Sequence, residues 1–231
     1  RLAAMRHVLT LFDMTAGQID EIFGWTKQLK KQYLNGDRQP KFAGKVMALL
    51  FEKPSLRTRV SFETAFAQLQ GSTMFLGPEV GWGHRESPED FSKVQTDYVD
   101  VVVCRSKNHG KLEQLAKHAF CPVVNGLTDL YHPCQALADL LTLSDFRGSF
   151  EGAKLAFVGD SNNVARSLAI ACGHLNVAFA IASPPEYQFD HAFLKRLEED
   201  FPRLQLTINT DPREVVRGAD VVYTDVWASM G

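Results

Sequence analysis

Arginine and hydroxyl side chains are concentrated in the segment SLRTR, residues 55–59. Ser55 is of a type that often occupies the position before a helix. Leu56, Arg57 and Thr58 would then form the first helical turn. A helix N-terminus offers free backbone N–H groups and a partial positive charge, and an arginine there adds paired donors. The segment therefore predicts a phosphate-binding site; the alternative is a capped surface helix with two solvated arginines.

Two further polar clusters follow other apolar stretches. Arg105 comes directly after the apolar run 101–104. His132 precedes Pro133, a residue suited to the first position of a helix, and Gln135 follows within that first turn. A single histidine before proline is usually a structural cap, but three polar clusters after three expected strands are harder to explain in that way. Ligands of open α/β sheets bind beyond the carboxyl ends of the strands, so we expect these residues to face one crevice.

The residue types of the three clusters fit one kind of reactant, a phosphate joined to a carbonyl group that an amine attacks. Arg57 and Arg105 can pair with the phosphate. Thr58, His132 and Gln135 can donate to the carbonyl oxygen while negative charge develops on it. This chemistry needs neither a metal nor a covalent enzyme intermediate.

Short apolar runs alternate with segments of helical periodicity along nearly the whole chain. The runs are residues 46–51, 73–76, 101–104, 123–124, 155–158, 178–182, 204–208 and 221–223. This alternation predicts an α/β protein with two doubly wound parallel-sheet domains. The charged, glycine-containing stretch 144–154 indicates the boundary. We therefore expect a first domain at 1–145 and a second at 150–231.

Composition limits the classes of partner. The 231 residues contain 25 Lys and Arg against 27 Asp and Glu, without a block of like charge. This balance argues against a nucleic acid or a membrane surface as partner and favours small molecules. The four cysteines are scattered without metal-ligand spacing, and no stretch approaches the roughly 20 apolar residues of a membrane span. We expect reduced cysteines, no metal and a cytoplasmic location.

Three segments, SLRTR, HPCQALADLL and TDVWASMG, resemble the signature motifs of the aspartate and ornithine carbamoyltransferases, and they occur in the same order along the chain. The last segment resembles the D-x-x-x-S-M-G loop of the ornithine enzymes rather than the acceptor loops of the aspartate enzymes. The resemblance implies transfer of a carbamoyl group from carbamoyl phosphate to the side-chain amine of L-ornithine. The products would be L-citrulline and phosphate, in arginine biosynthesis or the urea cycle, and no cofactor would be needed.

The resemblance also implies two sets of substrate-binding residues. Those for carbamoyl phosphate are Ser55, Leu56, Arg57, Thr58, Arg105, His132 and Gln135, of which Arg57, Thr58, Arg105 and His132 are the catalytic ones. Those for ornithine are Asn163, Asp225, Ser229 and Met230. Asp225 can pair with an α-ammonium group. Asn162 lies beside Asn163, and the sequence leaves open which of the two binds the substrate and which caps a helix.

Two features depart from the family pattern. The chain stops at Gly231, whereas the family continues through a His-Cys-Leu-Pro motif, so we expect the second domain to be truncated. The family also forms homotrimers with sites shared between subunits, in which a glutamine reaches the neighbouring site. The loop 77–84 contains no glutamine. Trp82 or His84 could replace it, although a solvated loop explains His84 more simply.

Other functions remain as alternatives. A carbamoyltransferase could use another amine, such as aspartate or an acylated ornithine, and a non-catalytic protein could bind carbamoyl phosphate without turnover. A dinucleotide-dependent dehydrogenase would share the alternating pattern. However, the loop 159–163 reads GDSNN and lacks the G-x-G-x-x-G fingerprint, and that function leaves SLRTR unexplained.

Overall fold

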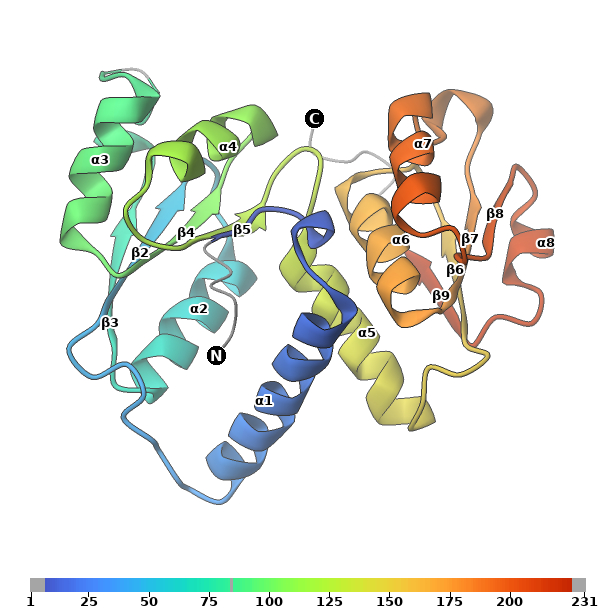
Figure 1. Ribbon diagram of the computed structural model, residues 1–231, viewed down its shortest axis with the longest axis horizontal. Coiled ribbons are helices and arrows are strands. Elements are labelled where there is room, and N and C mark those ends of the chain that lie inside the picture. The colour runs from blue at the N-terminus through green and yellow to red at the C-terminus, as the bar shows by residue number, and fades with distance from the viewer. Residues whose placement is uncertain (1–6, 84, 226–231) are drawn as a thin grey trace. The chain divides into compact units, whose positions relative to one another are not determined.

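The computed structural model describes residues 7–83 and 85–225. These residues form two compact units (Figure 1): one contains residues 7–9 and 17–128, and the other residues 10–16 and 129–225. Each unit has its own parallel sheet, which confirms the predicted class of two parallel-sheet α/β domains. The domain boundary at 145–150 stays a prediction. Within the described residues, no helix is long and apolar enough to cross a membrane.

The sheet of the first unit contains five strands in the order β1-β5-β4-β2-β3, and every neighbouring pair is parallel. Its strands are β1 (His7–Val8), β2 (Val46–Phe51), β3 (Ser72–Leu76), β4 (Val101–Arg105) and β5 (Val123–Leu127). The helices that follow them are α1 (Ala16–Leu34), α2 (Leu56–Gln68), α3 (Pro88–Tyr98) and α4 (His109–His118), with 3-10 turns at Leu11–Asp13 and Pro78–Val80.

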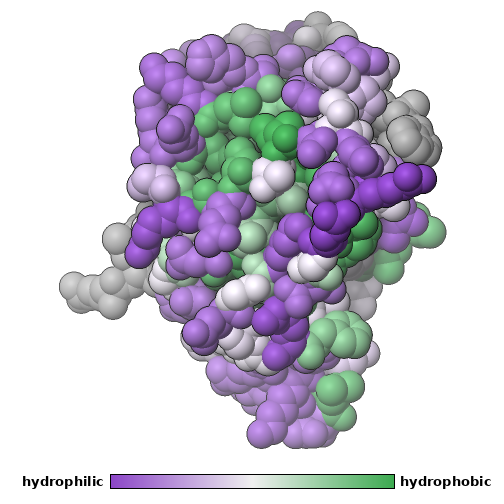
Figure 2. Space-filling model, turned by 90° about the vertical axis from the view of Figure 1, so that its right-hand side faces the viewer, coloured by the Kyte–Doolittle hydropathy of each residue, from purple (hydrophilic) through white to green (hydrophobic). Residues whose placement is uncertain are grey.

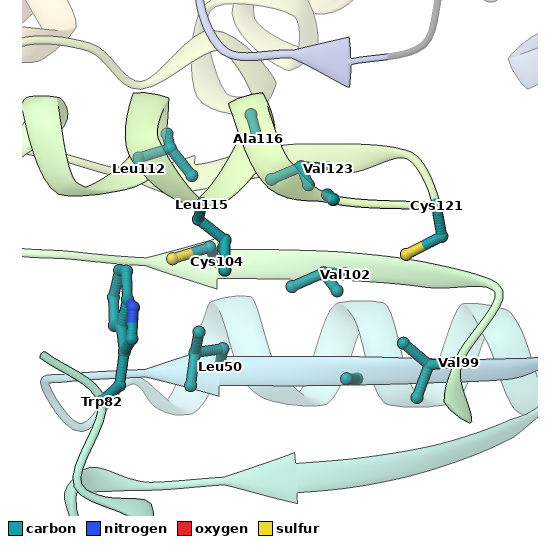
Figure 3. Packing of buried hydrophobic residues seen from close by; sticks show 12 residues of the cluster. Leu50, Trp82, Val99, Val102, Cys104, Leu112, Leu115, Ala116, Cys121 and Val123 are labelled. Atoms are coloured by element: carbon teal, nitrogen blue, oxygen red, sulfur yellow. The ribbon is translucent and has the colours of Figure 1, made fainter. Parts of the chain in front are cut away.

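Apolar side chains cover both faces of this sheet, as expected for parallel strands that read as continuous apolar runs. On one face, Leu112 and Leu115 of α4 pack over Val102 and Cys104 of β4 (Figure 3). On the other face, Phe66 of α2 packs against a second cluster from β2 and β4. The sheet is thus fixed from both sides, and its carboxyl edge is a rigid platform for the loops beyond it.

The sheet of the second unit has the strand order β8-β7-β6-β9 and is also parallel. Its strands are β6 (Lys154–Val158), β7 (Ala178–Ala182), β8 (Leu206–Asn209) and β9 (Val221–Thr224). Its helices are α5 (Pro133–Arg147), α6 (Asn163–Leu175), α7 (His191–Asp200) and α8 (Pro212–Val216), with a 3-10 turn at Pro185–Tyr187. Helix α6 is the most deeply buried of these, because its sequence is apolar on nearly every side.

The eight apolar runs of the sequence all correspond to strands, although two boundaries differ. The run 204–208 begins as a strand only at Leu206, since the backbone N–H of Leu204 closes a turn onto Phe201. The two-residue strand β1 gave no periodic signal and was not expected. The face of the molecule shown in Figure 2 is largely hydrophilic, with one hydrophobic area bordered by hydrophilic residues.

Candidate functional site

The segment SLRTR connects the end of β2 to α2, and its residues lie where the sequence predicted. Leu56 is the first residue of α2, and Ser55 occupies the cap position with extended backbone angles (φ −155°, ψ 113°). The Ser55 hydroxyl, however, caps no backbone N–H group. It accepts a hydrogen bond from Nη1 of Arg105 at 3.2 Å instead. The first turn of α2 therefore keeps its N–H groups without the usual side-chain cap, as an anion-binding helix terminus requires.

Arg105 is the last residue of β4, where it pairs in register with Phe51 at the end of β2. The same Nη1 atom donates to the Thr58 hydroxyl at 3.3 Å. Only 7% of Arg105 is exposed, and its Nε atom has no hydrogen-bond partner among the described residues. Burial, and then the positive charge of Arg57, lower the pKa of Arg105.

A buried donor without a partner and two neighbouring like charges are both unfavourable until an anion arrives. Arg57 itself is exposed on the first turn of α2, and Leu56 beside it is 77% exposed. A phosphate bound at this turn would offset the repulsion between Arg57 and Arg105. It would also accept hydrogen bonds from the backbone and from the guanidinium groups. The geometry of the first unit is therefore that of a phosphate site.

Glu52 strengthens the base of this site, and it was not singled out from the sequence. Its carboxylate accepts hydrogen bonds from the Ser106 hydroxyl (2.8 Å), the Lys107 backbone N–H (2.7 Å) and Nζ of Lys111 (2.9 Å). Burial alone would raise the pKa of Glu52, but these donors outweigh it and hold the pKa below its usual value. The loop after β2 is thereby tied to the loop after β4. An acidic residue directly after a strand was the available signal.

A cavity of about 360 Å³ opens beside Glu52. It is lined by Leu50, Phe51, Glu52, Gly77, Pro78, Trp82, Lys107, Asn108 and Lys111. Trp82 is only 4% exposed and packs into the core beside Leu50 (Figure 3). The suggestion that Trp82 reaches a neighbouring subunit is therefore wrong, because its side chain is part of the core of its own unit. His84 lies outside the described residues.

In the second unit, Pro133 is the first residue of α5 and His132 occupies the cap position, which confirms the helix start predicted for this motif. The His132 backbone N–H donates to Oγ of Ser167 at 2.8 Å. The Ser167 hydroxyl in turn donates to the carbonyl oxygen of Asn163 at 2.8 Å. One buried serine on α6 thus connects His132, a predicted carbamoyl-phosphate residue, with Asn163, a predicted ornithine residue.

Gln135 lies in the first turn of α5, and its Nε2 atom donates to Oδ1 of Asp139 at 2.9 Å. Burial raises the pKa of Asp139, although the hydrogen bonds from Gln135 and from the Tyr223 hydroxyl act in the opposite direction. Asp139 was not singled out from the sequence, where it reads as one more polar residue on an amphipathic helix.

The carboxyl ends of β6 and β9 bring a second polar group together. Asn162 caps α6: its Oδ1 accepts from the backbone N–H groups of Val164 and Ala165, both at 3.0 Å. Its Nδ2 donates to Oδ2 of Asp225 at 3.0 Å. Asn162 is therefore the helix cap, which settles the alternative that the sequence left open and leaves Asn163 as the candidate for substrate binding.

Asp160 adds a second carboxylate near Asp225. Burial, and then the negative charge of Asp225, raise the pKa of Asp160. Two carboxylates that repel each other favour a bound cation, so this edge of the sheet suits an ammonium group. Ser229 and Met230, the other predicted ornithine residues, lie outside the described residues.

Comparison with known proteins identifies the class to which this fold and these sites belong. Residues 6–145 match the family model described as aspartate/ornithine carbamoyltransferase, carbamoyl-P binding domain. Residues 151–231 match the one described as aspartate/ornithine carbamoyltransferase, Asp/Orn binding domain. The chain belongs to the aspartate/ornithine carbamoyltransferase family.

Individual relatives narrow this class. Ornithine carbamoyltransferase of Bacillus subtilis (strain 168) is 44% identical over 229 residues, which is 98% of this chain and 70% of the relative. The enzyme of the same name from Anoxybacillus flavithermus is 42% identical over 226 residues, covering 96% of this chain and 72% of the relative. Among solved structures, ornithine carbamoyltransferase from Pyrococcus furiosus has a TM-score of 0.95 and 41% identity, covering 98% of this chain and 74% of that one. These similarities confirm the resemblance found in the sequence motifs.

Proposed function

We propose that this protein transfers the carbamoyl group of carbamoyl phosphate to the side-chain amine of L-ornithine, giving L-citrulline and phosphate. The observation that carries the proposal is the buried Arg105, which is bonded to Ser55 and Thr58 at the N-terminus of α2. These residues lie in the segment that matches the carbamoyl-P binding domain. The ornithine carbamoyltransferases among the relatives support ornithine as the acceptor.

Carbamoyl phosphate would bind through its phosphate to the first turn of α2. Arg57 and Arg105 supply the cationic donors, and Leu56 contributes its backbone N–H group. The hydroxyl of Ser55 is already aligned by Arg105, so less ordering is required when the ligand binds. The buried Nε donor of Arg105 would gain a partner in the bound state, which explains why this arginine remains charged in a buried position.

The chemical step is the attack of the neutral ornithine amine on the carbonyl carbon. Negative charge then develops on the carbonyl oxygen, and donors from Thr58, Arg105 and His132 would stabilise it. The phosphate would leave against Arg57. Gln135 would complete the carbamoyl-phosphate site. These roles require only positioning and electrostatic stabilisation, without a covalent enzyme intermediate.

The amino-acid end of ornithine would bind at the carboxyl edge of β6 and β9. Asp225 carries the charge that an α-ammonium group requires, and Asn162 orients its carboxylate. We assign Asn163, Ser229 and Met230 to the remaining polar contacts. This division places charge recognition on Asp225 and hydrogen-bonding recognition on its neighbours.

We further propose a cytoplasmic homotrimer with sites shared between subunits. The family resemblance supports the assembly. The four cysteines, all without a disulfide in the structure and three of them buried, support a reducing compartment. Light scattering coupled to size exclusion tests the assembly, since a monomeric mass at micromolar concentration would contradict it.

The activity is tested by mixing the purified protein with carbamoyl phosphate and one of three amines: ornithine, aspartate or an N-acylated ornithine. Citrulline and phosphate should form in equal amounts with ornithine alone. Carbamoyl aspartate or an acylated citrulline as the main product would assign another acceptor. Ligand binding without turnover by any amine would favour a non-catalytic role. A matched reaction without amine corrects for spontaneous loss of phosphate.

A further inference from the structure

The hydrogen bond between Gln135 and Asp139 determines which way the Gln135 amide faces. The two residues are one turn apart on α5 and therefore lie on the same side of the helix. An ionised carboxylate can only accept hydrogen bonds, so the end of the amide that faces Asp139 must be its NH₂ group. This conclusion follows from the chemistry of the two groups, and the 2.9 Å contact from Nε2 to Oδ1 agrees with it.

The surroundings of Asp139 distinguish this pair from an ordinary surface pair. On α7, the pairs Lys195–Glu199 and Arg196–Asp200 have the same four-residue spacing, but all four side chains are largely exposed. Asp139 is half-buried, and the Tyr223 hydroxyl of β9 lies beside its carboxylate. Tyr223 is held by stacking on Phe157, with ring centroids 5.5 Å apart. Burying a carboxylate is unfavourable, so its partners must fix it in place.

We propose that Asp139 is a positioning residue, which holds the Gln135 amide so that its carbonyl oxygen, Oε1, accepts a hydrogen bond from the NH₂ group of carbamoyl phosphate. This inference rests on the proposed function and adds to it a determinant of specificity. The NH₂ group is the only donor on carbamoyl phosphate, whereas its phosphate and carbonyl oxygens are acceptors. A site that selects the carbamoyl group therefore needs one acceptor among its many donors.

The other carbamoyl-phosphate side chains are poorly suited to that task. Arginine has no acceptor atom. The hydroxyls of Ser55 and Thr58 already accept from Arg105. The oriented Oε1 of Gln135 then discriminates against an acyl phosphate with a methyl group in place of NH₂, since such a ligand would leave this acceptor unpaired.

The inference is tested with two stable ligands of equal size. Phosphonoacetamide carries the NH₂ group, and acetonylphosphonate carries a methyl group in its place. Calorimetry with the wild-type protein should show tighter binding of phosphonoacetamide by about threefold to tenfold, the range expected for one net hydrogen bond. Asp139→Leu should abolish most of this preference while leaving the affinity for acetonylphosphonate unchanged. Asp139→Ala is a second way of removing the carboxylate if leucine is not tolerated in the fold.

Gln135→Leu should remove the preference to the same extent. The double variant Asp139→Leu/Gln135→Leu should lose no more than Gln135→Leu alone, because Asp139 acts through Gln135. The matched control is Asp145→Leu, which removes an exposed aspartate from the same helix and should leave the preference intact.

Two results would overturn the inference in distinguishable ways. Equal weakening of both ligands by Asp139→Leu would reduce Asp139 to a structural role while leaving the proposed function standing. Failure of the wild-type protein to bind either phosphonate would contradict the proposed function together with the inference.

Discussion

Arg105 donates to the Thr58 hydroxyl at 3.3 Å, although 47 positions separate the two residues in the chain. The contact is possible because β2 and β4 are adjacent and end in register, with Phe51 opposite Arg105. The loops that leave these two strands therefore start at the same edge of the sheet. The phosphate site is thus a consequence of parallel pairing, and its donors can be tested separately.

Arg105→Lys should lower kcat/KM for carbamoyl phosphate by about 100-fold or more. Lysine keeps the charge but cannot reproduce the rigid set of donors that reaches Ser55 and Thr58 from one planar group. Steady-state kinetics with varied carbamoyl phosphate measure the effect. An unchanged value would show that only the charge at this position matters.

Arg57→Gln should raise the Michaelis constant for carbamoyl phosphate by roughly tenfold or more, because one phosphate-binding cation is lost. Arg59→Gln is the matched control on the same helix. Arg59 is already engaged by Glu63 at 3.0 Å and lies over the ring of Phe75 at 3.7 Å. We expect the control to have little effect on this constant. Equal effects of the two variants would contradict the assignment of Arg57.

Much of this site could be predicted from the sequence, because residue types alone mark strand ends and helix starts. The positions of Ser55 and His132 before their helices followed from their neighbours, Leu56 and Pro133. The partner of a side chain could not be predicted in the same way. The Ser55 hydroxyl was expected to cap α2, but Arg105 engages it from another strand, and no local pattern encodes that choice.

The distinction between Asn162 and Asn163 failed for a related reason. Both are asparagines, and either could cap α6 by its type alone. The position of the first helical turn decides between them, and sequence patterns locate such boundaries only to within a residue or two. The burial of Trp82 was missed because loop residues are expected at the surface, whereas this one packs into the core of its unit.

Asn162→Ala and Asn163→Ala should separate stability from substrate binding. Asn162→Ala should lower the free energy of unfolding by about 1 to 2 kcal/mol, since two backbone N–H groups lose their cap. Asn163→Ala should change stability little and raise the Michaelis constant for ornithine. Urea denaturation and steady-state kinetics with varied ornithine measure the two effects. The reverse pattern would exchange the roles assigned to the two residues.

Ser167→Ala should affect both substrates. The variant leaves the buried N–H of His132 without its acceptor and frees the carbonyl oxygen of Asn163. We expect a loss of stability of about 1 to 3 kcal/mol. The Michaelis constants for carbamoyl phosphate and for ornithine should both rise, because one residue of each predicted set loses its support. Ser149→Ala, at an exposed serine beyond the end of α5, is the control.

The contribution of Glu52 to stability should depend on pH with a definite sign. Its pKa in the folded protein lies below the value in the unfolded chain, because Lys107, Lys111 and Ser106 donate to the ionised form. A group of this kind stabilises the fold at pH values above its unfolded pKa, and the stabilisation is lost as the pH falls through the folded pKa.

Glu52→Gln should therefore cost about 1 to 3 kcal/mol near pH 7 and progressively less below about pH 4.5. Urea denaturation of the variant and the wild-type protein across this range measures the difference between their free energies of unfolding. Glu199→Gln is the control, since Glu199 is 63% exposed and lies 3.8 Å from Lys195. Its effect should stay within about 0.5 kcal/mol at every pH. A difference for Glu52→Gln that grows as the pH falls would mean that burial, and not the three donors, dominates at this carboxylate.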